Sequence, residues 1–332
     1  MTDTLRFVRA DTTPHAPALK TRRDDPRMSH RLVTLDADPQ PDRVQLVVLG
    51  VADGRGVQLQ GGRAGAADGP TKFRDHFFRM PAPAEFGAGS VLNAGDLEPA
   101  GHTQETHARL TEVVAVLRER FGAARFVVIG GGGDHAYGEI AGLARAVSRT
   151  YAQGRLAAVH VDAMADVTAY DSGREEPHAT TAFRRLLSDP GARLAGPSLL
   201  QWGIQRSANC QASLQFLLQH AVPTVFYEDI DGDERKAGAD LCGQVRQLSD
   251  NHQGLAMCVD LAAFSQAVAP GVSLPQAVGV AAGAVVRAVA LVGKLGIANQ
   301  LGLYELNPRF DQDGATARLA ARLAWSYATG KI

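Results

Sequence analysis

Two short segments of this sequence place acidic residues directly after runs of aliphatic and β-branched residues. Asp162-Ala-Met-Ala-Asp166 follows the run Leu156–Val161, and Asp260 follows the run Ala256–Val259. Two carboxylates four residues apart can converge on a hard cation, because such ions prefer oxygen ligands. Acidic residues at these places also suit the first turn of a helix, where they complement the helix dipole. For each acid taken alone, both interpretations stay open.

A glycine-rich segment, Gly130-Gly-Gly-Gly-Asp-His-Ala-Tyr-Gly138, follows another such run. A glycine turn that leads into a helix lets a phosphate approach backbone N–H groups. Gly131-x-Gly133-x-x-Ala136 fits a loose dinucleotide-binding fingerprint, with Asp162 as the candidate ribose ligand. The same glycines suit a tight turn that binds nothing. A dinucleotide-binding oxidoreductase is therefore one alternative for the function.

The elements that must position these residues alternate along the chain between strand and helix patterns. Such alternation predicts a parallel sheet with helices on both faces. We predict one three-layer, doubly wound α/β domain over residues 44–332, preceded by a polar N-terminal arm over residues 1–43. The predicted strands are Gln45–Leu49, Arg125–Ile129, Leu156–Val161, Ser198–Trp202, Thr224–Phe226 and Ala256–Val259. The predicted helices are Ala108–Phe121, Glu139–Tyr151, Gln211–His220, Gln276–Gly293 and Ala315–Tyr327.

In doubly wound folds, ligands bind at the carboxyl ends of the strands. This rule directs attention to the residues just after Ile129, Val161, Trp202 and Val259. Acidic residues at more than one of these ends make a shared site more credible than isolated helix caps.

The overall composition excludes several classes of protein. The 332 residues include 34 Lys and Arg against 35 Asp and Glu, a formal net charge of −1. This balance argues against an extended nucleic-acid surface or a polybasic membrane surface. The most apolar stretch, residues 279–293, is too short to cross a bilayer and contains Arg287. Three widely spaced cysteines and no apolar leader indicate a soluble, cytoplasmic protein without nucleic-acid or membrane partners.

Eight segments follow one another in a characteristic order: Gly62–Pro70, Gly130–Gly138, Asp162–Asp166, Thr181-Ala-Phe-Arg184, Gly203-Ile-Gln205 with Asn209, Val259-Asp-Leu-Ala262, Ala269–Ser273 and Glu305-Leu-Asn-Pro308. As an ordered set they resemble the arginase/agmatinase (ureohydrolase) family, and most closely its formimidoylglutamases. The resemblance covers nearly the whole chain after about residue 45. It implies an arginase-like fold.

The resemblance also implies a chemistry. In that family two Mn²⁺ ions share bridging carboxylates and activate a water, and the resulting hydroxide attacks the trigonal carbon of a guanidinium or formimidoyl group. For formimidoylglutamases the implied reaction converts N-formimidoyl-L-glutamate and water into L-glutamate and formamide, within histidine degradation. The implied partners are a small amidine or glutamate-like molecule and further copies of the chain in a homo-oligomer.

Compared position by position, the resemblance keeps only half of the metal ligands. Asp162 and Asp260 match the bridging carboxylates, and Asp166 matches a terminal carboxylate. Three further ligand positions lack a hard donor, since two histidines and one acid of the family are replaced by Gly133, Met164 and Ala262. A thioether suits Mn²⁺ poorly, and alanine has no ligating atom. We therefore expect an impaired or inactive two-manganese hydrolase, a pseudoenzyme, with one bound ion or none.

His135 lies two residues past Gly133 and is a candidate replacement ligand if the turn shifts locally. An active formimidoylglutamase with a reduced metal shell, His135 together with the three acids, is thus the second alternative. If no metal binds, the buried acids should take up protons or find hydrogen-bond donors.

The resemblance implies substrate contacts as well. Glu305 occupies the position that faces the cationic carbon of the substrate. Arg184 and Arg63 are candidates to bind a glutamate carboxylate through the arginine fork, although either also suits a salt bridge. His178 lies near the position of a proton-shuttling histidine of arginases, and a hydrogen-bonded loop histidine is the simpler interpretation.

Overall fold

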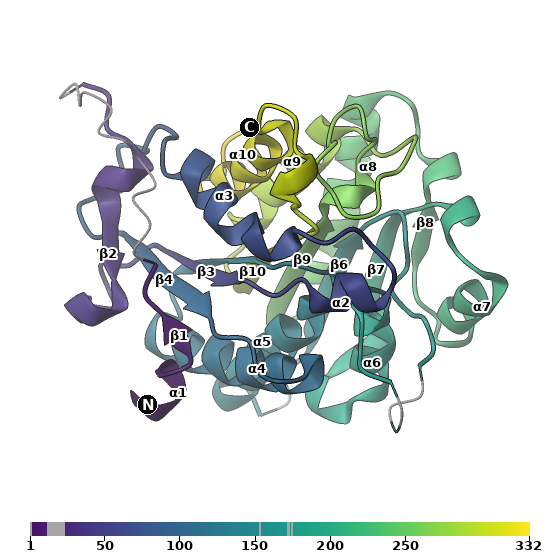
Figure 1. Ribbon diagram of the computed structural model, residues 1–332, viewed down its shortest axis with the longest axis horizontal. Helices are drawn as coiled ribbons and strands as arrows, with labels where there is room; N and C mark the ends of the chain where they lie inside the picture. The colour runs from purple at the N-terminus through teal and green to yellow at the C-terminus, as the bar shows by residue number, and fades with distance from the viewer. Residues whose placement is uncertain (1, 12–23, 153, 171–172, 174) are drawn as a thin grey trace.

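A twisted sheet of ten strands runs through the middle of the computed structural model, which describes residues 2–11, 24–152, 154–170, 173 and 175–332 (Figure 1). The strand order is β1-β4-β3-β5-β10-β9-β6-β7-β8, and β2 also pairs with β4. In the described residues β1 is antiparallel to β4, and the other neighbouring pairs are parallel. The strands are β1 Val8–Arg9, β2 Leu32–Thr34, β3 Leu46–Val51, β4 Val91–Leu97, β5 Arg125–Ile129, β6 Leu156–Val161, β7 Leu194–Ile204, β8 Thr224–Phe226, β9 Gly254–Asp260 and β10 Ala298–Tyr304.

Helices cover both faces of this sheet. Helices α3, α8, α9 and α10 pack on one face, and α4, α5 and α6 pack on the other (Figure 1). The central strands are apolar on both sides because each face is covered, and alternate side chains along them enter different core clusters. The helices are α1 Thr2–Leu5, α2 Arg55–Leu59, α3 Gly69–Phe77, α4 Thr103–Arg120, α5 His135–Thr150, α6 Ala182–Ser188, α7 Gln211–Gln219, α8 Glu234–Ser249, α9 Ala282–Val292 and α10 Ala315–Thr329.

The three-layer α/β class is confirmed, and the differences from the predicted elements have physical causes. Helix α9 begins at Ala282 and not at Gln276, because Gly279 packs against the backbone of Ala263, where a Cβ would lie 2.4 Å from the carbonyl oxygen. Strand β10 has no counterpart among the predicted strands, since Asn299 and Gln300 interrupt its apolar pattern.

The segment before residue 44, which we expected as a polar arm, contributes more than a lead-in. Its described part supplies β1 and β2, which both pair with β4 at one edge of the sheet. Met28 is fully buried in the same core cluster as Phe77 and Phe78. No helix in the described part of the chain is long and apolar enough to cross a membrane.

The order of the central strands determines where polar side chains can meet. Strands β5, β10, β9 and β6 are consecutive neighbours and run parallel. Their carboxyl ends therefore lie side by side, although the four strands are far apart in the sequence. The residues that follow Ile129, Val161 and Tyr304, together with Asp260 at the end of β9, are brought to one place.

Candidate functional site

Four carboxyl groups meet at the carboxyl ends of three adjacent strands. Asp162 directly follows β6, Asp166 lies in the loop beyond it, Asp260 ends β9, and Glu305 directly follows β10. All four residues are at most 5 % exposed. They line one small cavity of about 20 Å³, which is room for a single water molecule or ion.

The backbone around the cavity holds these acids in uncommon conformations. Asp166 has a φ of 53° and Glu305 a φ of 68°, values that residues with a side chain rarely adopt. Asn209 holds the Asp162–Asp166 loop through its side chain, which accepts a hydrogen bond from the Ala165 amide over 2.9 Å and donates one to the Ala163 carbonyl over 2.9 Å. Backbone strain of this kind is typical of functional sites.

The acids strongly disfavour ionisation in each other's presence. Burial first, and then repulsion from neighbouring carboxylates, raises the pKa of Asp162 and of Asp166 well above the usual range. The pKa of Glu305 is raised in the same way, and burial raises the pKa of Asp260 to about 7. Without a cation, the site therefore retains protons on some of its carboxyl groups near neutral pH.

Hydrogen-bond donors compensate only part of this charge. The Ala163 amide donates to Oδ1 of Asp162 over 2.6 Å, and the Ala262 amide donates to Oδ1 of Asp260 over 2.7 Å. Oε2 of Glu305 is buried and has no partner among the described residues. The acidic site thus leaves room for a cation or a proton beside Glu305.

The three positions without a hard donor lie at this same cavity. Met164 and Ala262 line it. A Cβ placed on Gly133 would lie 2.9 Å from Oδ2 of Asp166 and 3.5 Å from Oδ2 of Asp260. The gapless comparison that equates Gly133 with a ligand histidine therefore agrees with the geometry. The residues lining the cavity offer carboxylate oxygens and no imidazole, so this site does not fit the two-manganese centre implied by the family.

His160 is a neighbour of the acids that the sequence reasoning missed. It lies on β6 and is 1 % exposed, with Nε2 at 3.8 Å from Oδ2 of Asp162 and 3.7 Å from Oδ2 of Asp166. Its Nδ1 donates to Oε1 of Gln201 over 2.8 Å. Burial lowers the pKa of His160 to about 4, so the imidazole is neutral. The sequence feature that could have identified His160 is its position two residues before Asp162, which places both side chains on the same side of the strand.

His135, the candidate replacement ligand, lies in a different buried cluster. Its Nε2 is 3.8 Å from Oδ2 of Asp134, which also receives a hydrogen bond of 2.7 Å from Nε2 of His107. Arg185 donates to Nδ1 of His107 over 2.8 Å. The metal-ligating atoms of His135 group with those of His107 and Asp134, whereas those of His160 group with Asp162 and Asp166. The structure thus brings the three candidate acids together and places His135 apart from them.

The candidate substrate-binding arginines are held by carbonyls and aromatic rings. Arg184 donates from Nε to the Val167 carbonyl over 2.8 Å and stacks on Phe216. Arg63 donates to the Val272 carbonyl over 2.5 Å and stacks on a phenylalanine ring. Neither forms an ion pair within the described residues, and neither is among the residues that line the acid cavity.

His178, the tentative catalytic residue, is half-buried beside the cavity. It directly precedes two residues that line the cavity, Ala179 and Thr180. Its Nδ1 lies 3.3 Å from the hydroxyl of Thr180, and burial lowers its pKa. This hydrogen bond is what a loop histidine without a catalytic role would form, which is the simpler interpretation of His178.

The glycine turn after β5 has a packing reason. A Cβ on Gly131 would lie 1.9 Å from the carbonyl oxygen of Asp53. Glycine is therefore needed here because two backbone segments approach closely, a requirement that involves no dinucleotide.

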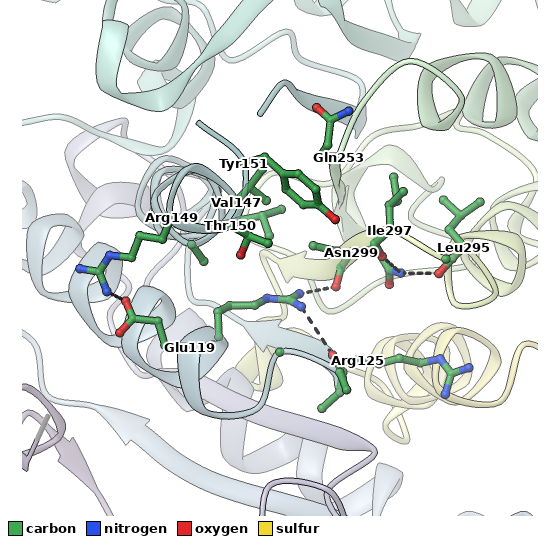
Figure 2. A pocket seen from close by; sticks show the side chains of 18 of the residues that line it. Glu119, Arg125, Val147, Arg149, Thr150, Tyr151, Gln253, Leu295, Ile297 and Asn299 are labelled. Atoms are coloured by element: carbon green, nitrogen blue, oxygen red, sulfur yellow. Dashed lines mark hydrogen bonds and ion pairs between the residues drawn. The ribbon is translucent and has the colours of Figure 1, made fainter. Parts of the chain in front are cut away.

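A larger hollow of about 720 Å³ lies at the opposite end of the central strands, beside the amino ends of β5, β9 and β10 (Figure 2). Figure 2 shows Tyr151, Gln253 and Asn299 around it, and the ion pair between Arg149 and Glu119 at its side. None of the four acids lines this hollow. The two cavities are therefore separate, and the carboxyl ends of the strands carry the acidic chemistry.

Comparisons with known proteins agree with the resemblance. A sequence model of the arginase family matches residues 44–330. The chain is 30 % identical over 328 residues to the formimidoylglutamase of Citrobacter koseri, covering 96 % of this chain and 98 % of that protein. The crystal structure of formimidoylglutamase from Bacillus subtilis superposes with a TM-score of 0.80 at 21 % identity, covering 99 % and 97 % of the two chains. Trypanosoma cruzi formiminoglutamase with Mn²⁺ has a TM-score of 0.77 at 26 % identity, covering 92 % and 98 %.

Proposed function

This chain belongs to the arginase family, and we propose that it is a formimidoylglutamase relative that has lost hydrolysis by a two-manganese centre. The observation that carries the proposal is the place of Gly133, where a side chain would point directly at Asp166 and Asp260. A ligand position of the family is thus occupied by a residue without a side chain.

The remaining donor set supports the same conclusion. Two adjacent Mn²⁺ ions need enough oxygen and nitrogen ligands to hold both ions and a water between them. Met164 and Ala262 line the cavity without supplying a hard donor.

The proposed role is that of a binding or regulatory protein for a small amidine or glutamate-like molecule. Arg184 and Arg63, which have no ion-pair partner in the described part of the chain, are the proposed contacts for its carboxylate. The proposal includes a cytoplasmic location and self-association of the chain, which light scattering of the purified protein would measure.

The test is hydrolysis of N-formimidoyl-L-glutamate by the purified protein with excess Mn²⁺, followed as release of glutamate and formamide. The Asp162→Ala/Asp260→Ala double variant measures contaminating activity, and the Citrobacter koseri relative serves as the positive control. Circular dichroism establishes that both proteins are folded. Release no faster than that of the double variant supports the proposal.

Turnover that disappears in the double variant would overturn the proposal. It would favour the alternative, an active formimidoylglutamase with a reduced metal shell, within histidine degradation. His160 then replaces His135 as the first nitrogen ligand to examine, because it lies beside Asp162 and Asp166.

A further inference from the structure

We infer that His160, Asp162 and Asp166 form a mononuclear site for a divalent transition metal, with Nε2 of His160 as a nitrogen ligand that replaces the lost histidines. This inference rests on the proposed loss of the two-manganese centre. It adds a ligand from inside strand β6, at a position that the resemblance does not assign to metal binding.

The three donor groups already face one another. One ligand atom from each lies within 4.8 Å of the other two, and Nε2 of His160 is 3.8 Å and 3.7 Å from the facing oxygens of Asp162 and Asp166. Donors that share a tetrahedral Zn²⁺ ion lie roughly 3.3 Å apart, given metal–ligand distances of about 2.0–2.1 Å. Small side-chain shifts are enough to admit an ion.

The state of the imidazole matches that of a ligand. Nδ1 of His160 carries the hydrogen, because it donates to Oε1 of the Gln201 side-chain amide. That amide is itself oriented by a hydrogen bond of 2.9 Å from Nε2 of Gln201 to the Ala165 carbonyl. Nε2 of His160 therefore carries the lone pair, and it lies 3.8 Å and 3.7 Å from the facing oxygens of Asp162 and Asp166. In metal sites a ligand histidine is oriented in the same way, by a hydrogen bond from the ring nitrogen that does not bind the metal.

The other buried histidine cluster, formed by His107, Asp134 and His135, lacks such an arrangement. Arg185 donates to Nδ1 of His107, so the hydrogen of His107 lies on Nε2 and is donated to Asp134. A cation there would face a hydrogen and a nearby guanidinium. The imidazole of His107 is therefore committed to Arg185 and Asp134. The ring nitrogens of His135 have no hydrogen-bond partner among the described residues, so no group orients that imidazole as Gln201 orients His160.

The donor set indicates which metals bind. One imidazole with carboxylate oxygens suits Zn²⁺, Co²⁺ or Fe²⁺ better than Mg²⁺ or Ca²⁺, which prefer oxygen donors alone. A divalent ion also balances the negative charge of two buried carboxylates, which donors from the chain compensate only in part. We expect Zn²⁺ and Co²⁺ to bind more tightly than Mg²⁺.

The experiment uses the full chain after removal of metals with a chelator. Calorimetry with Co²⁺ and with Zn²⁺ measures the stoichiometry, and X-ray absorption of the Zn²⁺-loaded protein measures the number of imidazole ligands. We expect one ion per chain with one imidazole. His160→Gln should weaken Co²⁺ binding by at least about tenfold, whereas His135→Gln, the matched buried histidine, should leave it unchanged.

The inference would be overturned by no binding of Co²⁺ or Zn²⁺ to the folded protein, or by a zinc spectrum without an imidazole ligand. The second does not depend on a variant and stays decisive if His160→Gln fails to fold. Equal binding by wild type and folded His160→Gln would also overturn it. The hydrolysis assay on the same samples keeps the two proposals distinct. One bound ion without turnover supports both, and one bound ion with turnover overturns only the proposed loss of activity.

Discussion

Gly133 lies so close to Asp166 that a Cβ atom on the glycine would be 2.9 Å from Oδ2 of the carboxylate. The φ angle of Gly133 lies outside the left-handed region that favours glycine, so its backbone does not require the absence of a side chain. At this position the acids of two strands face the glycine directly, since Oδ2 of Asp260 would lie 3.5 Å from the same Cβ. A ligand at this position would complete one side of the site.

Restoring the three ligands should restore metal binding. The variant Gly133→His/Met164→His/Ala262→Asp adds two imidazoles and a carboxylate at residues that border the cavity. We expect it to bind Mn²⁺ tightly and at up to two ions per chain, measured by calorimetry and elemental analysis. The carboxylate of Asp166 has to move to admit the new side chain, because a Cβ on residue 133 would lie 2.9 Å from its Oδ2.

The control for this variant is Gly133→Ala/Met164→Leu/Ala262→Ser, which changes the same positions without adding imidazole or carboxylate. It should gain no Mn²⁺ affinity. If the restored variant is folded and binds Mn²⁺ no better than this control, the correspondence between these positions and the ligands of the family is wrong.

The stability of the metal-free protein should depend on pH through Asp260. Burial raises the pKa of this carboxyl group to about 7 in the folded protein, whereas it is about 3.9 in an unfolded chain. Between these values the unfolded state binds fewer protons than the folded state, so the free energy of unfolding falls as pH rises. The loss is at most about 1.4 kcal/mol per pH unit for each proton, and for Asp260 it ends above pH 7.

Urea unfolding between pH 4 and pH 8, with a chelator present, measures this slope. Buried His107 and His160 act in the opposite direction below about pH 6.5, because burial lowers the pKa of each. The comparison is therefore with Asp260→Asn, which keeps both histidines and removes this acid, while Asp162, Asp166 and Glu305, whose pKa values are also raised, remain in both proteins. A wild-type profile that falls no more steeply with pH than that of the variant would contradict the prediction.

The elements and acids that could be predicted are those with a local signal. Strand β6 and Asp162 could be read because a continuous apolar run ends at an acid. His160 escaped notice because it is one polar residue within that run, and only the sheet shows that its ring reaches the acids. Strand β10 was missed because Asn299 and Gln300 resemble a loop. In the structure both side chains are buried and form hydrogen bonds. Asn299 accepts one from the hydroxyl of Tyr327, and Gln300 donates one to the Glu139 carbonyl.

Side-chain directions across the glycine turn could not be derived from spacing. From the sequence alone, either Gly133 or His135 could face the acids, because a local shift of two residues in the turn leaves the surrounding sequence pattern almost unchanged. In the structure the turn is set by Gly131, which packs against the Asp53 carbonyl. That contact directs position 133 to the acids and leaves His135 with Asp134.

Asn209 should be needed to hold the Asp162–Asp166 loop. Its side chain makes three hydrogen bonds, to the Ala165 amide and to the carbonyls of Ala163 and Gln205, all of 2.8–2.9 Å. Asn209→Ala leaves the Ala165 amide without its partner, so we expect a loss of about 1–3 kcal/mol in the free energy of unfolding and weaker Co²⁺ binding. Asn251→Ala, which removes one exposed hydrogen bond to Gln247, is the control. Equal stability of the two variants would show that Asn209 does not hold the loop.

Gly131 should tolerate no side chain, for a reason that is independent of any ligand. Because a Cβ would lie 1.9 Å from a backbone oxygen that cannot rotate away, Gly131→Ala forces β5 and the Asp53 segment apart. We expect a loss of about 1–3 kcal/mol or more in the free energy of unfolding, measured by urea denaturation. Gly232→Ala, where a Cβ meets nothing within 4 Å, should unfold like the wild type. A Gly131→Ala variant as stable as Gly232→Ala would contradict the packing account.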